Sequence, residues 1–188
     1  MMHAMGWQAT FPAPLDAAPR ALAGLRSRAA SELLERGMRS AGLEPWTPRK
    51  GPFGNPLPEA GWYVSKSHCS DHVAAALARV PVGIDVEPIR LARVATWERV
   101  IDAAEARLLG PVDALAFTRL WTAKEAVLKA HEVGIAGLSK CRLVQVLSPS
   151  CLELRYQDRR HRVHQQFVAQ HVVSLCAVGQ ETVSWPQP

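Results

Sequence analysis

The sequence lacks several features that would place it in common protein classes. Its four cysteines form no C-x-x-C pair, which argues against a zinc knuckle or a disulfide framework and favours a reduced, cytoplasmic protein. No apolar run is long enough to span a membrane, and Pro12 and Pro14 interrupt the N-terminal stretch. We therefore expect neither a membrane segment nor a secretory signal. Two tyrosines and four phenylalanines are too few for a nucleic-acid stacking platform.

Lysine is also scarce. Of the 22 cationic side chains only five are lysines, and the formal net charge is +5. This basic balance suits an anionic partner, which can be a nucleic acid, a nucleotide-like ligand or an acidic protein. In a chain that so strongly prefers arginine, each retained lysine is of interest. The lysines are Lys50, Lys66, Lys124, Lys129 and Lys140.

The first half of the chain reads as a helix, a loop and short strands. Apolar periodicity predicts a helix over Ala17–Ala41, which Gly42 and Pro45 end. A loop rich in proline and glycine follows over 46–58. Strands are predicted over 63–66, 73–78 and 82–87.

The second half begins with helices and ends with strands. We expect helices over 96–109 and 112–131, strands over 141–147, 151–156, 161–169 and 172–178, and a disordered tail over 185–188. Each half thus combines helix with a small antiparallel set of strands, which predicts an α+β fold. We expect two similar lobes, residues 1–90 and 91–188, that form one structural unit with a crossing near 88–95 and a ligand cleft between them.

Two short segments carry most of the chemistry. In the strand G-I-D-V-E, Asp85 and Glu87 are two residues apart and project from one face. In the helix that follows, Trp121, Glu125 and Lys129 recur every four residues along one stripe. Taken singly, these are ordinary strand-end acids, a surface ion pair and a core tryptophan. Together, three converging acids suit magnesium, which takes few protein carboxylates and leaves room for phosphate oxygens.

Other side chains could hold a phosphate. Ser67 and His68 follow a strand and can both donate hydrogen bonds. Arg49 and Lys50 lie on a loop that proline stiffens, and Arg20 lies at a helix start. For each alone, a solvated cation or a structural histidine is the ordinary alternative.

In their order along the chain, these segments resemble the 4′-phosphopantetheinyl transferases, specifically the two-lobed, surfactin-synthetase-activating type. The resemblance runs from about Arg20 to Leu143, and the pair G-I-D-V-E and W-x-x-K-E-A at this separation is its specific part. The matching residues are Arg20-x-x-x-Gly24, Lys50 and Pro52, Ser67-His68, Gly83-Ile84-Asp85-Val86-Glu87, Glu105, and Trp121-x-x-Lys124-Glu125-Ala126-x-x-Lys129-Ala130.

The resemblance implies two pseudo-symmetric lobes in a monomer, with coenzyme A in the cleft between them. It implies that Asp85, Glu87 and Glu125 hold Mg²⁺, or Mn²⁺, against the pyrophosphate. The coenzyme A-binding residues would be Arg20, Arg49, Lys50, Ser67, His68, Asp85 and Lys129. The implied reaction moves the phosphopantetheine arm to a serine of an acidic apo acyl or peptidyl carrier protein of polyketide or nonribosomal peptide biosynthesis. Glu125 and Lys129 would be the catalytic residues.

The sequence departs from the family pattern at a few positions. Ser65 stands where asparagine is frequent, Cys69 replaces a frequent serine, and His131 begins the segment where a glycine-rich turn is usual. Two other readings stay open, a metal-dependent phosphodiesterase or nuclease and a basic nucleic-acid-binding module. The acid-x-lysine spacing common in such nucleases is absent, because Pro88 and Ile89 follow Glu87.

Overall fold

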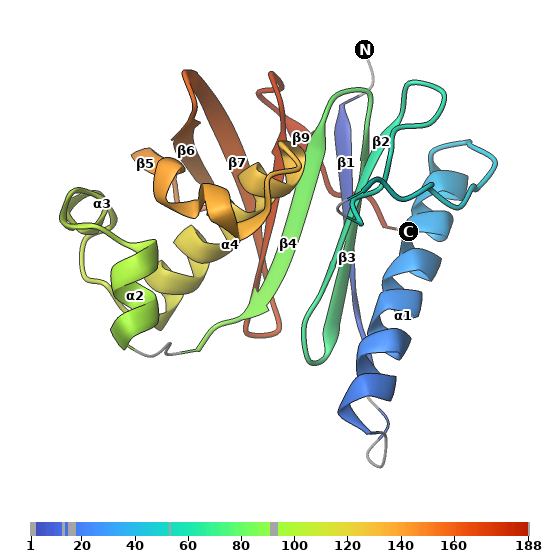
Figure 1. The fold of residues 1–188 in the computed structure, drawn as a ribbon, viewed down its shortest axis with the longest axis horizontal. Helices are drawn as coiled ribbons and strands as arrows, with labels where there is room; N and C mark the ends of the chain where they lie inside the picture. The colour runs from blue at the N-terminus through green and yellow to red at the C-terminus, as the bar shows by residue number, and fades with distance from the viewer. Residues whose placement is uncertain (1–2, 13, 15–17, 53, 91–93, 188) are drawn as a thin grey trace.

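The structure is a computed structural model that describes residues 3–12, 14, 18–52, 54–90 and 94–187. It has an α+β architecture with two sheets, each packed with helix (Figure 1), which confirms the expected fold class. The strand order is β2-β3-β1-β9 in the first sheet and β4-β8-β7-β6-β5 in the second. Among the described residues, no helix combines the length and apolar character that crossing a membrane requires.

The first sheet is covered on one face by the long helix α1. In β3, Val73, Ala75 and Leu77 pack towards α1, while the alternate alanines face the second sheet. The elements are β1 (Ala4–Thr10), α1 (Pro19–Ser40), β2 (Tyr63–His68), β3 (His72–Ala78) and β9 (Val183–Ser184).

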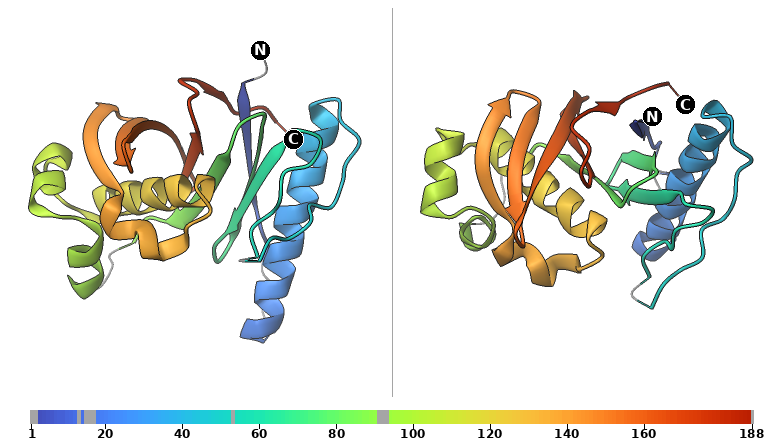
Figure 2. Two further views of the ribbon diagram at one scale, coloured as in Figure 1. Left: turned by 45° about the horizontal axis from the view of Figure 1, so that its top comes forward. Right: turned by 90° about the horizontal axis from the view of Figure 1, so that it is seen from above.

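The second sheet has α4 packed across one face, with the shorter helices beyond it. Figure 2 shows α4 against this sheet and α1 on the outer flank of the first. Leu120 and Val127 of α4 pack onto Leu152 and Leu154 in a buried core. The elements are β4 (Val82–Pro88), α2 (Val94–Val100), α3 (Ala103–Leu109), α4 (Ala114–Ala130), η1 (Gly134–Lys140), β5 (Arg142–Ser148), β6 (Cys151–Tyr156), β7 (Arg159–Val168) and β8 (His171–Ala177).

The two sheets share a third apolar core. The alanine face of β3 contributes Ala74, Ala76 and Ala78, which meet Ile84 and Val86 of β4. Because these side chains are small, the two sheets can approach closely. The strand β4 precedes residue 90 but pairs with β8, and β9 pairs with β1, so each sheet takes a strand from the other half of the chain. The division into lobes at residue 90 stays a prediction.

Two local predictions are wrong, and one strand was not predicted. The helix expected over 96–109 is two helices, because Asp102 accepts hydrogen bonds from the backbone N–H groups of Ala104 and Glu105 and so begins α3. The strand β1 was not expected. The tail is not wholly disordered, since an added Cβ at Gly6 would stand 2.6 Å from the ring of Trp185. The last residue of that tail, 188, lies outside the described residues.

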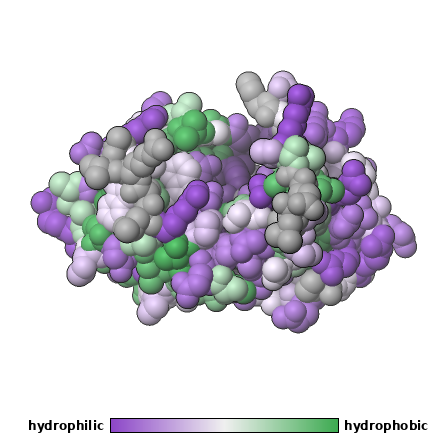
Figure 3. All heavy atoms as spheres, turned by 90° about the horizontal axis from the view of Figure 1, so that it is seen from below, coloured by the Kyte–Doolittle hydropathy of each residue, from purple (hydrophilic) through white to green (hydrophobic). Residues whose placement is uncertain are grey.

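The surface is mostly polar on the face that Figure 3 shows. Hydrophilic residues dominate there, and small apolar patches lie between them. Such scattered apolar patches are ordinary for a protein surface in water.

Candidate active site

Close packing of α4 on β4 creates the candidate site. A Cβ added at Gly83 would overlap the carbonyl oxygen of Ala126, so only glycine lets the helix backbone rest on this strand. Asp85 and Glu87 follow at intervals of two and therefore face α4 as Gly83 does. Between them, Val86 points the other way, into the core between the sheets.

Lys129 joins three elements. Its ammonium group lies 2.7 Å from Asp85 Oδ1, 3.0 Å from Ser67 Oγ and 3.0 Å from the carbonyl oxygen of Ile84. The hydroxyl of Ser67 donates to the same oxygen of Asp85 at 2.7 Å. Next to it, Ser65 Oγ accepts the Ile84 N–H at 3.1 Å. Residues of β2, β4 and α4 thus meet at one point, across the boundary between the sheets.

The carboxylates around Lys129 repel one another. Burial raises the pKa of Glu125, and the charges of Asp85 and Glu87 raise it further, while Lys129 opposes them. Burial also raises the pKa of Glu87, again with a contribution from Asp85. The surroundings of both glutamates therefore favour a bound cation or a proton.

The donor set fits a divalent metal ion. Asp85 Oδ2 and Glu125 Oε1 are buried and have no hydrogen-bond partner among the described residues. Within the same residues, the oxygens of Asp85, Glu87 and Glu125 do not all lie within 4.8 Å of one another. Magnesium is usually bound through one or two carboxylates, with water and phosphate oxygens as its other ligands. The site fits that mode, and ligation by all three acids stays a prediction.

Several lysine and arginine side chains lie near the end of β2. Burial lowers the pKa of His68, and the nearby charges of Arg26 and Lys129 add to this. Burial likewise lowers the pKa of Lys66, with Lys50 contributing next. Lys50, Lys66, Arg26 and Lys129 therefore lie in one region around His68, and their positive charges favour binding of an anion.

Arg20 and Arg49 are less closely tied to this region. Both are exposed, as are His68 and Lys50. Within the described part of the chain, the side chains of Arg20 and Arg49 show no hydrogen bond or ion pair, so nothing brings them to the group. Because β2 alternates, the buried Ser67 and the exposed His68 lie on opposite faces.

Sequence reasoning did not assign two cations of this region. Lys66 donates to Ser31 of α1 at 2.7 Å, and Arg26 of α1 donates to the carbonyl of Ser70 at 3.1 Å. Strand alternation from His68 would have found Lys66, which lies two residues earlier. No sequence signal separates Arg26 from the other arginines of its helix.

A cavity of about 680 Å³ opens beside Lys129. Its wall includes β2, the start of β4, the end of α4 and η1, so it lies where the two sheets meet, in the region expected for a cleft. The polar part of its wall includes Asn55, Ser65, Lys66, Lys129 and Glu132.

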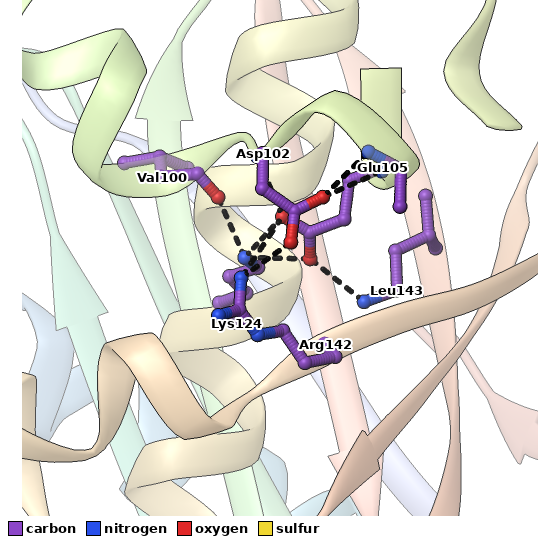
Figure 4. A network of polar contacts seen from close by, with 7 residues as sticks. Val100, Asp102, Glu105, Lys124, Arg142 and Leu143 are labelled. Carbon is purple, nitrogen blue, oxygen red and sulfur yellow. Dashed lines mark hydrogen bonds and ion pairs between the residues drawn. The ribbon is translucent and has the colours of Figure 1, made fainter. Parts of the chain in front are cut away.

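The lysine of the W-x-x-K-E-A motif has a different role from its neighbours. Lys124 is 1% exposed and lies 2.7 Å from Glu105 Oε1 and 2.6 Å from the carbonyl oxygen of Val100. Glu105 also accepts the N–H of Leu143 at 2.8 Å, and Arg142 approaches from β5 (Figure 4). This network joins α4 to α2, α3 and β5, so it supports the helix that carries Glu125.

Buried acids, a lysine and an adjoining cavity between two sheets define a site suited to a phosphate ester with a divalent cation. Residues 81–176 match the model of the 4′-phosphopantetheinyl transferase superfamily, which covers half of the chain. The chain belongs to this superfamily.

Curated relatives agree with this assignment. The chain is 30% identical over 135 residues to enterobactin synthase component D of Escherichia coli O157:H7 and to the protein of the same name from Shigella flexneri. The match covers 69% of this chain. It spans 65% of the length of each of these relatives.

Proposed function

We propose that this protein transfers the 4′-phosphopantetheine arm of coenzyme A to a serine hydroxyl of an apo carrier protein and releases 3′,5′-ADP. One observation carries the proposal. Asp85 and Glu125 each have a buried oxygen without a hydrogen-bond partner among the described residues, and Lys129, which pairs with Asp85, lines the cavity. Membership of the superfamily and the similarity to an enterobactin synthase component support the same reaction class.

The cavity and its charges suit coenzyme A. A volume of about 680 Å³ falls within the range usual for ligand sites. Lys66 lines the cavity, and Lys50 and Arg26 add positive charge near the end of β2, which favours the phosphates of the coenzyme. We assign the 3′-phosphate to the Lys50 and His68 side, where the neutral ring of His68 can donate a hydrogen bond. Arg20 and Arg49 stay predicted contacts of the same phosphate.

In the proposed mechanism the protein mainly positions the reactants. Glu125, on the helix that carries Lys129, accepts the proton of the carrier serine, directly or through a water molecule that it orients. The serine oxygen then bonds to the phosphorus that bears the pantetheine arm, and the bond from this phosphorus to the oxygen of 3′,5′-ADP breaks. Lys129, which Asp85 and Ser67 hold in place, donates to the diphosphate. Mg²⁺, held by Asp85 and Glu125 with Glu87 nearby, would neutralise charge on the diphosphate when bound.

The test is a mass measurement on the carrier. The protein is incubated with coenzyme A, Mg²⁺ and apo carrier proteins from fatty-acid, polyketide and peptide pathways, and each carrier should gain one phosphopantetheine arm if it is a substrate. We expect Asp85→Asn and Glu125→Gln to lower the rate by at least about 100-fold, since each removes a charged group from the reacting centre. Glu181→Gln, at an exposed position that does not line the cavity, is the matched control.

Two outcomes would contradict the proposal. One is the absence of a mass gain on every carrier although the protein is folded. The other is transfer by Glu125→Gln at the wild-type rate under limiting Mg²⁺. Because the chain carries a net charge of +5 and the expected carriers are acidic, we also expect transfer to slow as salt rises.

A further inference from the structure

A second cluster of metal-binding side chains lies outside the candidate active site, on the turns β2–β3 and β7–β8. Cys69 Sγ, Asp71 Oδ1 and His171 Nε2 all lie within 4.8 Å of one another. Asp71 Oδ1 is 4.0 Å from the sulfur and 2.9 Å from the ring nitrogen. With zinc–ligand bonds of about 2.0–2.3 Å, the donor atoms of a tetrahedral zinc site lie roughly 3.3–3.6 Å apart. Small side-chain rotations would bring the three atoms to that spacing.

His171 is oriented as a metal ligand is. Its Nδ1 lies 2.7 Å from the carbonyl oxygen of Ala169, and since a carbonyl only accepts, this nitrogen carries the proton. The other nitrogen, Nε2, is thereby aimed at Asp71. A backbone carbonyl that fixes one ring nitrogen while the other binds is the usual second shell of a metal-bound histidine. The side chain is only 4% exposed, so its orientation is firmly held.

A tight hairpin turn precedes His171. Ala169 and Gln170 connect Val168 to His171 in a two-residue loop, and both have positive φ, 44° and 63°, as a type I′ turn requires. His171 is therefore the first residue of β8 after the turn.

A neighbouring histidine provides independent support. His72 is 2% exposed, its ring stacks on that of His171 at 3.9 Å, and neither of its nitrogens has a hydrogen-bond partner within the described residues. Its Nδ1 lies 3.8 Å from Asp71 Oδ1. Buried polar atoms are normally satisfied, so an unpartnered imidazole beside three possible ligands indicates a group that is absent from the protein chain itself.

We propose that Cys69, Asp71 and His171 bind a divalent transition-metal ion of the zinc class, with His72 as the nearest further nitrogen. Sulfur and imidazole favour such an ion over magnesium, which prefers oxygen ligands. The side chain of Asp71 is 51% exposed, so a metal ion can reach this cluster from the solvent. The ion would link the β2–β3 turn of the first sheet to β8 of the second sheet. His171 of β8 pairs with Pro88, at the end of the strand that carries Asp85 and Glu87.

Cobalt absorption spectroscopy tests this proposal. The full chain is stripped of metal, kept reduced with a reductant that contains no thiol, and titrated with Co²⁺. We expect one equivalent to give the near-ultraviolet charge-transfer band of a thiolate–cobalt bond, and Zn²⁺ to displace it. Cys69→Ser should abolish the band, and His171→Gln should weaken Co²⁺ binding at least tenfold. Cys151→Ser, a half-buried cysteine on β6, should leave the band unchanged.

The outcomes separate the possibilities. Asp85→Asn should keep the band, because the candidate active site contains no sulfur ligand. A wild-type protein without a thiolate–cobalt band, or a band that survives Cys69→Ser, would overturn the proposal and leave His171 and Asp71 as an ion pair. Should His171→Gln fail to fold by circular dichroism, Cys69→Ser and Asp71→Asn carry the test. Zn²⁺ should then raise the melting temperature of the wild type and not that of either variant.

Discussion

Replacing Lys124 by methionine should destabilise the protein through a single broken network. The ammonium group lies 2.6 Å from the carbonyl oxygen of Val100 and 2.7 and 2.9 Å from the two carboxylate oxygens of Glu105. All three of its protons therefore have acceptors. Methionine fills a similar volume but donates nothing, so α4 loses its polar link to α2 and α3 (Figure 4).

The size of the loss in unfolding free energy depends on which partners Glu105 keeps. Its carboxylate stays buried and keeps the N–H groups of Asp102 at 3.0 Å and Leu143 at 2.8 Å. Arg142 remains 4.0 Å away. Removing one partner of a buried ion pair costs about 3–5 kcal/mol. Because two backbone donors and a cation remain, we expect the lower end, about 3 kcal/mol of unfolding free energy.

Urea unfolding measures this loss. Lys140→Met, at an exposed lysine, is the matched control and should change the free energy of unfolding by less than about 0.5 kcal/mol. Adding Glu105→Gln to the methionine variant should recover part of the loss, because the unpaired charge is gone. A loss below about 1 kcal/mol for the single variant, with an unchanged dependence on urea, would refute the reasoning.

Three further predictions concern single side chains. Lys129→Ala removes the ammonium group that Asp85 and Ser67 hold in place and that donates to the diphosphate in the proposed mechanism. It should therefore raise the KM for coenzyme A about tenfold in the carrier assay. Gly83→Ala places a Cβ against the helix backbone, and this overpacking should lower the free energy of unfolding by about 1–3 kcal/mol in urea. Burial lowers the pKa of His161 to about 4. An unfolded histidine titrates near about 6.5, so the folded protein should lose up to about 3 kcal/mol as the pH falls from about 6.5 to 4, and His161→Gln should remove this part of the acid sensitivity.

Each of the three has a control. Gly24→Ala adds a Cβ in open space on α1 and should be neutral or mildly stabilising, so equal effects at both glycines would show that contact with α4 is not the cause. Lys140→Ala should leave the KM for coenzyme A unchanged. The exposed His3→Gln should keep the acid sensitivity of the wild type. A His161→Gln variant that also kept it would rule out His161 as its source.

Periodicity predicted which side chains share a face of one element. Alternation along β4 puts Asp85 and Glu87 on one face, and the four-residue spacing along α4 puts Glu125 and Lys129 on one stripe, because both depend only on local geometry. That these two surfaces meet comes from the fold. What periodicity cannot give is the partner of a strand. That β4 pairs with β8, and that Ser67 reaches Asp85 across the sheets, depend on contacts between distant segments.

The features that were missed have the same physical origin. The first strand, Ala4–Thr10, carries few β-branched residues, and its pairing with β3 is decided by the tertiary fold. Asp102 is a residue type that often begins a helix, and the prediction of one helix over 96–109 did not take it into account. Cys69 and His171 are 102 positions apart in the sequence and have no spacing motif, so only the fold brings them together.

Contacts on three sides hold β4, the strand that carries Asp85 and Glu87. The site therefore depends on how the two sheets pack together. On one face Gly83 admits α4, on the other Val86 enters the shared core, and along its side Ser65 and Ser67 of β2 bond to Ile84 and Asp85. A change in how the two sheets pack would therefore move Asp85 relative to Glu125 even if both acids were intact. The proposed reaction needs one cation to reach both carboxylates and the diphosphate, so we expect it to depend on the packing of the shared alanine core as well as on the acids.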